Sequence, residues 1–477
     1  MTTGNSAPTM PPGRGRGAWR CRTRRGLATG AAVLVAAVLA APVPAGAAEH
    51  CPGADRARVP GAQYQISACL PDLTTAGTVA SGHTDPADYA GLAATGTRNP
   101  SGVPGLQIDG YFPDSSTTNT EHGWEHDAQF VLRLPDRWNG GLVVTGAPGN
   151  RHQYSLDDTI SDWALAAGYA YAATDKGNTG ADFWRDGRRP GDAIAEWNRR
   201  VTQLTVAAKA TLVAHYRQPV RRTLMTGLSN GGYLTRWQLE NHPQLYDAGI
   251  DWEGTLLRAD GPNLLTYLPT ALRAYPGYAS TADPAAHRAM LRAGFAPGSE
   301  FLWPFHYQYY WDLTQRVYRA EFDPGYSPDD PAGTPFCTSG TPHCDADYDY
   351  ASRPASVHRA MRRVQLTGRI GKPLITLQGT LDSLLPIATD SDEYARLVAA
   401  HGRGQLYRYY RIADGNHVDG LYDSFPQRLR PILPCYRAAF SAMTRWLDDH
   451  VDTPPPSGTV PRPPSGTDVV NTCSLAG

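Results

Sequence analysis

The sequence predicts an α/β protein in which a mostly parallel sheet carries helices on both faces and is interrupted by an insertion. Apolar strand candidates alternate with amphipathic helices through residues 129–252, and the alternation returns at residues 373–450. Short apolar runs are typical of strands buried on both faces, and their alternation with helices is typical of parallel sheets. Residues 254–365 lack this alternation, which predicts that they are inserted into the sheet domain.

Each element is placed by its periodicity. The helix near 194–212 is the clearest, because Ile194, Trp197, Val201 and Leu204 recur at steps of three and four and form one apolar face. The expected strands are 63–68, 129–134, 142–144, 169–173, 223–225, 248–252, 373–378 and 406–412, and the other expected helices are 162–167, 233–240, 387–400 and 431–450.

The chain divides into five predicted parts. These are a signal peptide (1–47), the first part of the sheet domain with an irregular N-terminal segment (48–253), the lid insertion (254–365), the second part of the sheet domain (366–452) and a Pro-rich tail (453–477). Six prolines between residues 453 and 466 predict that the tail is an extended tether.

The N-terminal segment has the order of residues that is typical of an export signal. A basic region ending at Arg25 precedes the apolar stretch 27–41, and the small residues 45–47 suit cleavage. The apolar stretch has about 15 residues, fewer than the ~20 that span a membrane. We therefore expect a secreted, extracellular protein that has no membrane partner after export. The sequence leaves the general and twin-arginine export routes open.

Charge excludes one class of partner. The composition, with 41% hydrophobic and 19% charged residues, is that of a globular protein. The net charge is −1, and the first 47 residues hold six arginines and no acid, so the remainder carries about −7. A chain with this balance has no overall attraction to phosphate backbones, and we expect no nucleic-acid partner.

The cysteines agree with an oxidising compartment. Six of the seven follow the predicted signal peptide and form three couples that are close in sequence. Six cysteines allow fifteen pairings, and we prefer the three that close short loops. These are Cys51–Cys69, Cys337–Cys344 and Cys435–Cys473.

The pentapeptide 227–231 (GLSNG) matches the G-x-S-x-G pattern of a nucleophile elbow. The pattern alone also suits an ordinary glycine-rich turn, but here it stands between an expected strand and an expected helix. Glycines permit the crowded turn, and the helix N-terminus presents N–H groups to negative charge. Ser229 is therefore the candidate nucleophile.

A serine nucleophile needs a positioned base, and in this fold the chain order is serine, acid, histidine. His417 follows the expected strand 406–412 in a loop, at the edge of the sheet where Ser229 lies. His401 and His450 also lie downstream but end helices. His417 is the candidate base.

The candidate acid is Asp382, in the loop after the strand one place ahead of His417. Its role would be to hold the imidazole in the correct tautomer and to stabilise imidazolium. Glu253 and Asp251, at the strand ending near residue 252, are the alternatives.

Stabilising a tetrahedral oxyanion requires two backbone N–H groups. Asn230 follows the nucleophile and supplies one. The turn 145–149 supplies the other, and since Pro148 has no N–H, we expect Gly146 or Ala147.

These residues together resemble the α/β-hydrolase superfamily and, within it, secreted bacterial esterases. Residues 163–180 and 134–140 look like the corresponding stretches of the tannase/feruloyl-esterase family, and 3-hydroxybutyrate-oligomer hydrolases are also similar. The resemblance covers about 130–250 and 370–450 and implies an α/β-hydrolase fold with a lid that cleaves carboxylic esters. Leu228 and Val418 stand where the tannase family has two bonded cysteines.

The resemblance also implies that the lid could bind calcium. Asp345, Asp347 and Asp349 alternate after Cys344, and carboxylate oxygens suit Ca²⁺. A solvated acidic turn is the alternative, because the full spacing of an EF-hand loop is absent. The predicted chemistry itself requires no cofactor.

We expect hydrolysis of a small-molecule or oligomeric ester through an acyl-enzyme. A serine peptidase uses the same triad, and a non-catalytic protein that binds a polymer or cell wall is the alternative from another class. Seven aromatic residues between Phe301 and Trp311 predict either a pocket for a bulky apolar group or the core of the insertion itself.

Overall fold

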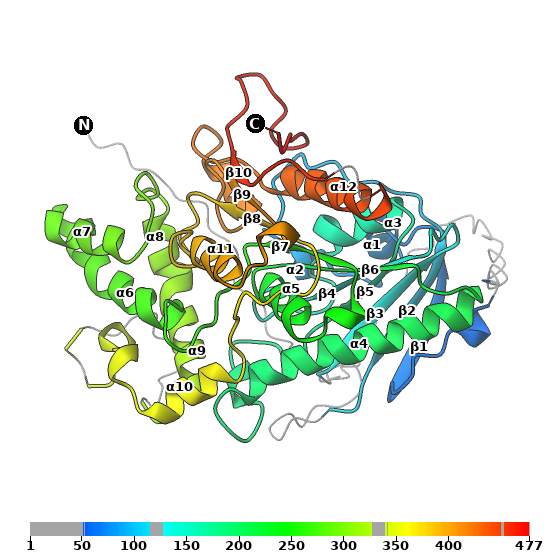
Figure 1. Ribbon diagram of the computed structural model, residues 1–477, viewed down its shortest axis with the longest axis horizontal. Helices are drawn as coiled ribbons and strands as arrows, with labels where there is room; N and C mark the ends of the chain where they lie inside the picture. Colours follow the sequence, from blue (N-terminus) through cyan, green and yellow to red (C-terminus); the bar gives the residue numbers. More distant parts are fainter. Residues whose placement is uncertain are drawn as a thin grey trace, which may run out of the picture. The chain divides into compact units, whose positions relative to one another are not determined.

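A sheet of ten strands organises the chain (Figure 1). The computed structural model describes residues 51, 53–114, 127–326, 339–340, 342–449 and 453–476. The strands lie in the order β1-β2-β3-β5-β4-β6-β7-β8-β9-β10. Pairing is antiparallel from β1 to β5 along this order and parallel from β5 to β10. Their bounds are β1 (Tyr64–Leu70), β2 (Gly105–Tyr111), β3 (Gln129–Pro135), β4 (Gly141–Gly146), β5 (Ala170–Thr174), β6 (Arg222–Leu228), β7 (Ala248–Trp252), β8 (Leu374–Gly379), β9 (Tyr407–Ile412) and β10 (Gly458–Val460).

Helices cover both faces of this sheet. Alternate strand residues enter two separate apolar cores, with Leu142 and Val144 in one and Val143 in the other. The first core includes α4, α5 and α11, and the second includes α3 and α12, so the predicted arrangement is confirmed. The helices of the sheet domain are α1 (Thr75–Ala80), α2 (Pro86–Tyr89), α3 (Asp162–Ala166), α4 (Asp192–Tyr216), α5 (Asn230–Asn241), α11 (Ser391–Ala400) and α12 (Leu433–Asp449).

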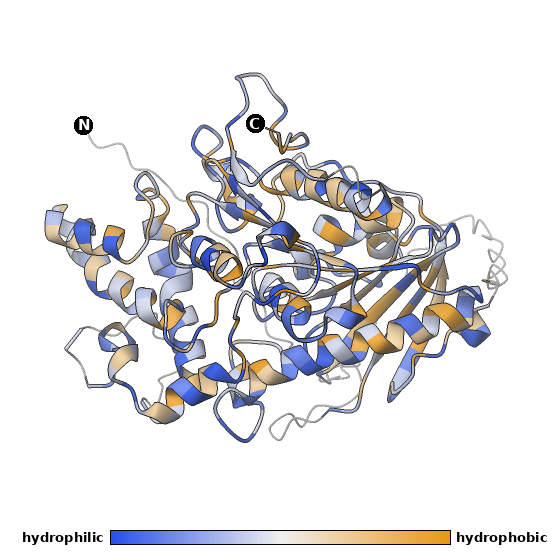
Figure 2. Ribbon diagram, viewed as in Figure 1, coloured by the Kyte–Doolittle hydropathy of each residue, from blue (hydrophilic) through white to orange (hydrophobic). Residues whose placement is uncertain are grey.

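The periodicity of α4 places it on the sheet as the sequence predicts. Ile194, Trp197, Val201 and Leu204 are fully buried or nearly so, while Val206 and Val213 on the other side are exposed. Figure 2 shows the resulting stripes of polar and apolar colour along this helix. The apolar stripe of α4 packs against three neighbouring strands, β3, β4 and β5.

The sequence does not predict β2. Its residues, GLQIDGY, are all buried, because β2 lies between β1 and β3 and is covered on both faces. Buried Gln107 and Asp109 interrupt the apolar pattern, and they are tolerated because the Gln107 amide donates to Asp109 and accepts from Arg133. Polar residues that satisfy one another inside a sheet hide a strand from analysis of periodicity.

The segment between β7 and β8 is the insertion. Its described residues fold into α6 (Leu264–Thr281), α7 (Pro284–Arg292), α8 (Trp303–His306), α9 (Asp312–Phe322) and α10 (Ala355–Arg362). Several hydrogen bonds connect it to the edge of the sheet, and two of them come from its aromatic side chains. The Trp311 indole donates to Ser383 O at 2.7 Å, and the Tyr318 hydroxyl donates to Asn230 Oδ1 at 2.6 Å.

The Pro-rich tail is not a free tether, contrary to expectation. Gly458–Val460 forms β10 and pairs with β9, and the Tyr410 hydroxyl donates to Pro455 O at 2.6 Å. The disulfide Cys435–Cys473 joins the tail to α12. Proline content indicates extended backbone, but pairing with the free edge of β9 depends on tertiary structure.

Two of the three predicted disulfides, Cys51–Cys69 and Cys435–Cys473, are confirmed. Cys344 is also disulfide-bonded, but its predicted partner, Cys337, lies outside the described residues, as does the predicted signal peptide 1–47. Among the described residues no helix is both long enough and apolar enough to cross a membrane.

Replacing Cys435 and Cys473 together by alanine is expected to lower the free energy of unfolding by about 2–4 kcal/mol, because the bridge closes a long loop. Urea denaturation of this double variant and of the parent chain measures the difference. The control is the double replacement of Cys51 and Cys69 by alanine. Because the Cys51–Cys69 disulfide closes a shorter loop, a smaller loss of unfolding free energy is expected. Equal stability of the parent and the Cys435/Cys473 variant would contradict the anchoring role of the tail.

Candidate active site

Ser229 occupies a strained turn between β6 and α5. Its backbone angles are φ 58° and ψ −118°, a region that costs on the order of 1–3 kcal/mol for a residue with a side chain. The turn is held by the Ser229 amide, which donates to Trp252 O at 2.9 Å. It also requires glycine, since a Cβ on Gly227 would lie 2.4 Å from the Gly231 carbonyl carbon. This geometry projects the serine hydroxyl away from the sheet, as a nucleophile elbow does.

His417 reaches Ser229 from the loop after β9. Its Nε2 lies 3.1 Å from Ser229 Oγ, and the imidazole is 5% exposed. The loops after β8 and β9 are in direct backbone contact, because a Cβ on Gly379 would lie 2.3 Å from the Gly415 carbonyl carbon. His401 is exposed at the end of α11, and His450 lies outside the described residues. Of these histidines, His417 is therefore the one that the fold brings to Ser229.

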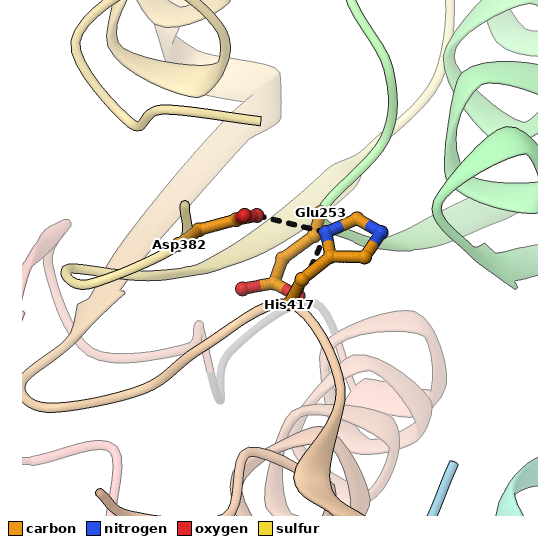
Figure 3. A group of neighbouring side chains, drawn as sticks. All are labelled: Glu253, Asp382 and His417. Atoms are coloured by element: carbon orange, nitrogen blue, oxygen red, sulfur yellow. Dashed lines mark hydrogen bonds and ion pairs between the residues drawn. The ribbon is translucent and has the colours of Figure 1, made fainter. Parts of the chain in front are cut away.

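Asp382 contacts the other nitrogen of the same imidazole (Figure 3). Its Oδ2 lies 2.8 Å from His417 Nδ1 and also accepts from Gln378 Nε2 at 2.7 Å. The second oxygen accepts from the backbone amides of Leu384 and Leu385 at 2.8 and 2.9 Å. These donors hold the carboxylate in one orientation, which sets the tautomer of the imidazole: hydrogen on Nδ1 and a free lone pair on Nε2 toward serine.

A second acid, Glu253, lies beside this pair (Figure 3). Its Oε2 is 3.7 Å from His417 Nδ1, and its Oε1 accepts from the Gly379 amide at 2.7 Å. Burial, with the neighbouring Asp382 charge, raises the pKa of Glu253 well above its usual range. These surroundings favour the protonated form of Glu253. The other alternative acid, Asp251, is bonded to Arg236 at 2.6 Å and faces away from the imidazole.

The sequence predicts that Gly146 or Ala147, in the turn after β4, supplies the second oxyanion donor, but both residues pair with Thr174 instead. The Ala147 amide already donates to Thr174 O at 2.9 Å, and Gly146 is paired with Thr174 inside the sheet. Gly149, further along the turn, lines the cavity beside Ser229, and its carbonyl accepts from the Asn230 side chain at 3.0 Å. Asn230 and Gly149 therefore both line the cavity beside Ser229, whereas Gly146 and Ala147 do not.

A cavity of about 240 Å³ opens on Ser229 and His417. It is enclosed by the β4 turn, the elbow, the loops after β8 and β9, and helix α9 of the insertion. Leu228 and Val418, which stand at the positions of the tannase cysteines, also line it. The remaining lining residues are Leu92, Pro148, Gly149, Asn150, Arg151, Phe183, Asn230, Tyr310, Leu313, Thr314, Val317, Tyr318 and Leu384.

Comparison with known proteins finds similarity to ester hydrolases. The 3HB-oligomer hydrolase family profile matches residues 343–475, which include Asp382 and His417. A probable feruloyl esterase of Arthroderma benhamiae is 28% identical over 148 residues, 28% of this chain and 27% of the relative. A D-(-)-3-hydroxybutyrate oligomer hydrolase of Azoarcus sp. is 29% identical over 119 residues, 23% of this chain and 17% of the relative. The matches thus span about a quarter or less of these relatives.

Solved structures of similar architecture include feruloyl esterase B from Aspergillus oryzae, with a TM-score of 0.48, 13% identity and coverage of 82% of this chain and 88% of that one. Tannin acyl hydrolase from Aspergillus niger has a TM-score of 0.46, 14% identity and coverage of 81% and 83%. The order of the strands and the elbow after β6 decide the fold class. The chain has an α/β-hydrolase fold.

Two of the seven aromatic residues at 301–311, Trp303 and Trp311, belong to the buried core of the insertion, and Tyr307 packs against it, whereas Tyr309 is 54% exposed. Trp303 and Trp311 are fully buried, and both pack against Phe295. Their ring centroids lie 6.2 and 5.2 Å, respectively, from the centroid of the Phe295 ring. Tyr310 differs from them, since it lines the cavity on Ser229. Two cavity aromatics, Phe183 and Tyr318, come from outside residues 301–311. The density of rings in the sequence therefore does not by itself distinguish the core of the insertion from the pocket.

The three acids proposed for calcium have separate partners within the protein. Asp345 forms a two-pronged ion pair with buried Arg319, both contacts at 3.0 Å. Asp347 accepts from the Ser339 hydroxyl at 2.6 Å, and Asp349 accepts from the Ala351 amide at 3.2 Å. This arrangement does not form a shared set of oxygen ligands, so no calcium-dependent step is derived.

Several residues at the site carry no signal in the sequence. Gln378, Tyr318 and Arg151 are far from the nucleophile along the chain and belong to no motif, yet each contacts a triad residue, a donor or the cavity. Only Gly149 could have been found, because it belongs to the same glycine-rich turn as the two expected donors.

Asp382→Asn is expected to lower kcat/KM by about 10³–10⁴-fold, because the amide would favour the wrong imidazole tautomer. Glu253→Gln should cost less than about tenfold, since the protonated form of Glu253 is favoured and an amide mimics a protonated acid. Steady-state kinetics on purified variants measures both. A loss in Glu253→Gln as large as that in Asp382→Asn would reassign the acid.

Residual activity in Asp382→Asn should rise with pH. The pKa of Glu253 is raised in part by the charge of Asp382, so removing that charge makes Glu253 easier to ionise. The ionised Glu253 carboxylate can then accept a hydrogen bond from His417 Nδ1. The double variant Asp382→Asn, Glu253→Gln is the control and should lack this rise. A rise of the same size in both variants would exclude Glu253 as its source.

Two variants, Trp303→Ala and Tyr310→Ala, should distinguish a ring in the core of the insertion from a ring that lines the cavity. Trp303→Ala is expected to destabilise the protein by about 3–5 kcal/mol, because it empties a fully buried site. Tyr310→Ala should change kcat/KM for aryl esters more than for short alkyl esters, with a smaller change in Tm. Calorimetry and kinetics on both variants decide, and equal Tm losses with no change in selectivity would place Tyr310 in the core as well.

Proposed function

We propose that the protein is a carboxylic ester hydrolase that works through an acyl-enzyme on Ser229. The observation that carries the proposal is the line of contacts from Asp382 through His417 to Ser229, at 2.8 and 3.1 Å, which ends at a cavity. A serine hydroxyl aligned with an oriented imidazole is the arrangement that general-base activation requires. The names of the two relatives, a probable feruloyl esterase and a D-(-)-3-hydroxybutyrate oligomer hydrolase, support ester cleavage.

The reaction follows from these positions. Ser229 Oγ attacks the ester carbonyl while His417 Nε2 takes its proton, and the imidazolium is stabilised by Asp382. The tetrahedral oxyanion is stabilised by the amides of Asn230 and Gly149. The intermediate collapses by breaking the bond to the alcohol, which leaves with the proton from His417. Water then attacks the acyl-enzyme by the same route, and one ester and one water yield one acid and one alcohol.

We infer that the substrate places one short acyl or aryl group in the cavity. The volume of the cavity is about 240 Å³, which is smaller than most sites that enclose small ligands. Both a hydroxybutyryl unit and a compact aromatic acid would present a carbonyl to Ser229 from such a cavity. We also propose export, which is supported by the disulfides among the described residues.

Ser229→Ala and His417→Ala should each remove nearly all ester hydrolysis, by at least about 10⁴-fold, without loss of fold. A fluorophosphonate probe should label the parent protein and not Ser229→Ala. Ester and peptide substrates tested together distinguish an esterase from a peptidase. Labelling of Ser229→Ala, or activity above a few per cent in that variant, would exclude Ser229 as the nucleophile, and absence of any labelling in the parent would favour a binding protein.

A further inference from the structure

The cavity at Ser229 contains one arginine among otherwise uncharged groups. Of its lining residues in the described part of the chain, Arg151 alone carries a full charge at neutral pH, when His417 is the neutral base. The neighbours are apolar side chains and neutral polar groups such as Tyr310 and Asn150. An ester without charge has no need of a cation in such a place, so the presence of Arg151 calls for an explanation.

The internal contacts of Arg151 do not neutralise it. Nη1 donates to Asp88 O at 2.9 Å and Nη2 donates to Ala90 O at 3.0 Å, and both acceptors are backbone carbonyls. The ion pairs of the described residues include none between Arg151 and a carboxylate. A guanidinium has five N–H donors in a planar fork, so donors remain for a further acceptor.

The nearest acids compensate this charge only weakly. Burial lowers the pKa of Arg151, and the carboxylates of Asp158 and Asp88 oppose this effect only through space. Burial, with repulsion from Asp162 and Asp157, raises the pKa of Asp158 to about 8, and burial also raises the pKa of Asp88. Asp158 is therefore mostly protonated at neutral pH. A positive potential remains at the cavity wall, where the low dielectric strengthens it.

We propose that Arg151 binds an anionic group, such as a carboxylate, on the substrate, and that the enzyme prefers esters whose acyl or alcohol portion ends in such a group. This inference rests on the proposed ester hydrolysis and specifies its substrate class. Guanidinium and carboxylate match in a two-pronged geometry, and such charge-assisted contacts are stronger than neutral ones. Arg151 follows the turn that carries Gly149, so the anion would be held by the same segment that supplies an oxyanion donor.

The test compares two chromogenic esters of similar size, p-nitrophenyl butyrate and the mono-p-nitrophenyl ester of succinic acid. The parent protein should have the higher kcat/KM for the succinate half-ester, and added salt should reduce this preference by raising KM. Arg151→Gln should lower kcat/KM for the half-ester by about tenfold or more while changing the neutral ester by less than about threefold. Arg151→Lys keeps the charge and should retain part of the preference.

Arg430→Gln is the matched control. Its guanidinium also donates to two backbone carbonyls, Pro461 O at 2.7 Å and Val460 O at 3.3 Å, but it does not line the catalytic cavity. This variant should leave the ratio of the two kcat/KM values unchanged. Arg151→Gln could instead lower kcat/KM for both esters alike and reduce Tm as Arg430→Gln does. In that case Arg151 serves only to hold residues 88–90 in place, and the inference is overturned.

Failure of the two proposals can be told apart. Hydrolysis of both esters with equal efficiency in the parent and in Arg151→Gln would refute the role of Arg151 and leave the esterase proposal intact. If no ester is hydrolysed, calorimetry of monomethyl succinate with Ser229→Ala still tests Arg151. Binding that is lost in Ser229→Ala, Arg151→Gln supports the inference, and no binding to Ser229→Ala overturns it.

Discussion

Direct contact between glycine backbones holds the catalytic loops at the carboxyl edge of the sheet. A Cβ on Gly231 would lie 2.5 Å from Gly146 O, and one on Gly379 would lie 2.3 Å from the Gly415 carbonyl carbon. The first contact joins the elbow to the β4 turn, and the second joins the loops that carry Asp382 and His417. Because interiors are close-packed, even one methyl group at these points would separate the loops and lengthen the contacts of the triad.

A buried charge network supports these loops from below. The Arg236 guanidinium of α5 bonds Asp251 of β7 at 2.6 Å and Asp390, before α11, at 2.9 Å. Asp390 in turn accepts from the Leu256 amide at 2.7 Å, at the start of the insertion. A buried charge is tolerated only where every partner is satisfied. The network therefore couples the position of α5, whose N-terminus carries Ser229, to the two chain segments that flank the site.

The insertion acts on the site through a few contacts and encloses the cavity with its remaining surface. Tyr318 donates to the Asn230 side chain, which itself donates to Gly149 O, so a residue of the insertion is linked to both proposed oxyanion donors. Trp311 donates to Ser383 O, next to Asp382. The same helix region thus has two roles: it holds buried rings, and it contributes uncharged side chains to the wall of the cavity.

The sequence by itself determined the parallel part of the sheet, its covering helices and the chain order of Ser229, Asp382 and His417. It could do so because apolar periodicity and turn glycines are local, and strand ends in a parallel sheet meet at one edge. Only the tertiary structure decided that the Ala147 amide is already bonded, that the pKa of Glu253 is raised, and that the tail becomes a strand. Each of these depends on groups distant in sequence: Thr174 occupies the Ala147 amide, Asp382 suppresses ionisation of Glu253, and β9 offers its free edge to β10. Hydrogen-bond occupancy and pKa are properties of surroundings, and surroundings exist only after folding.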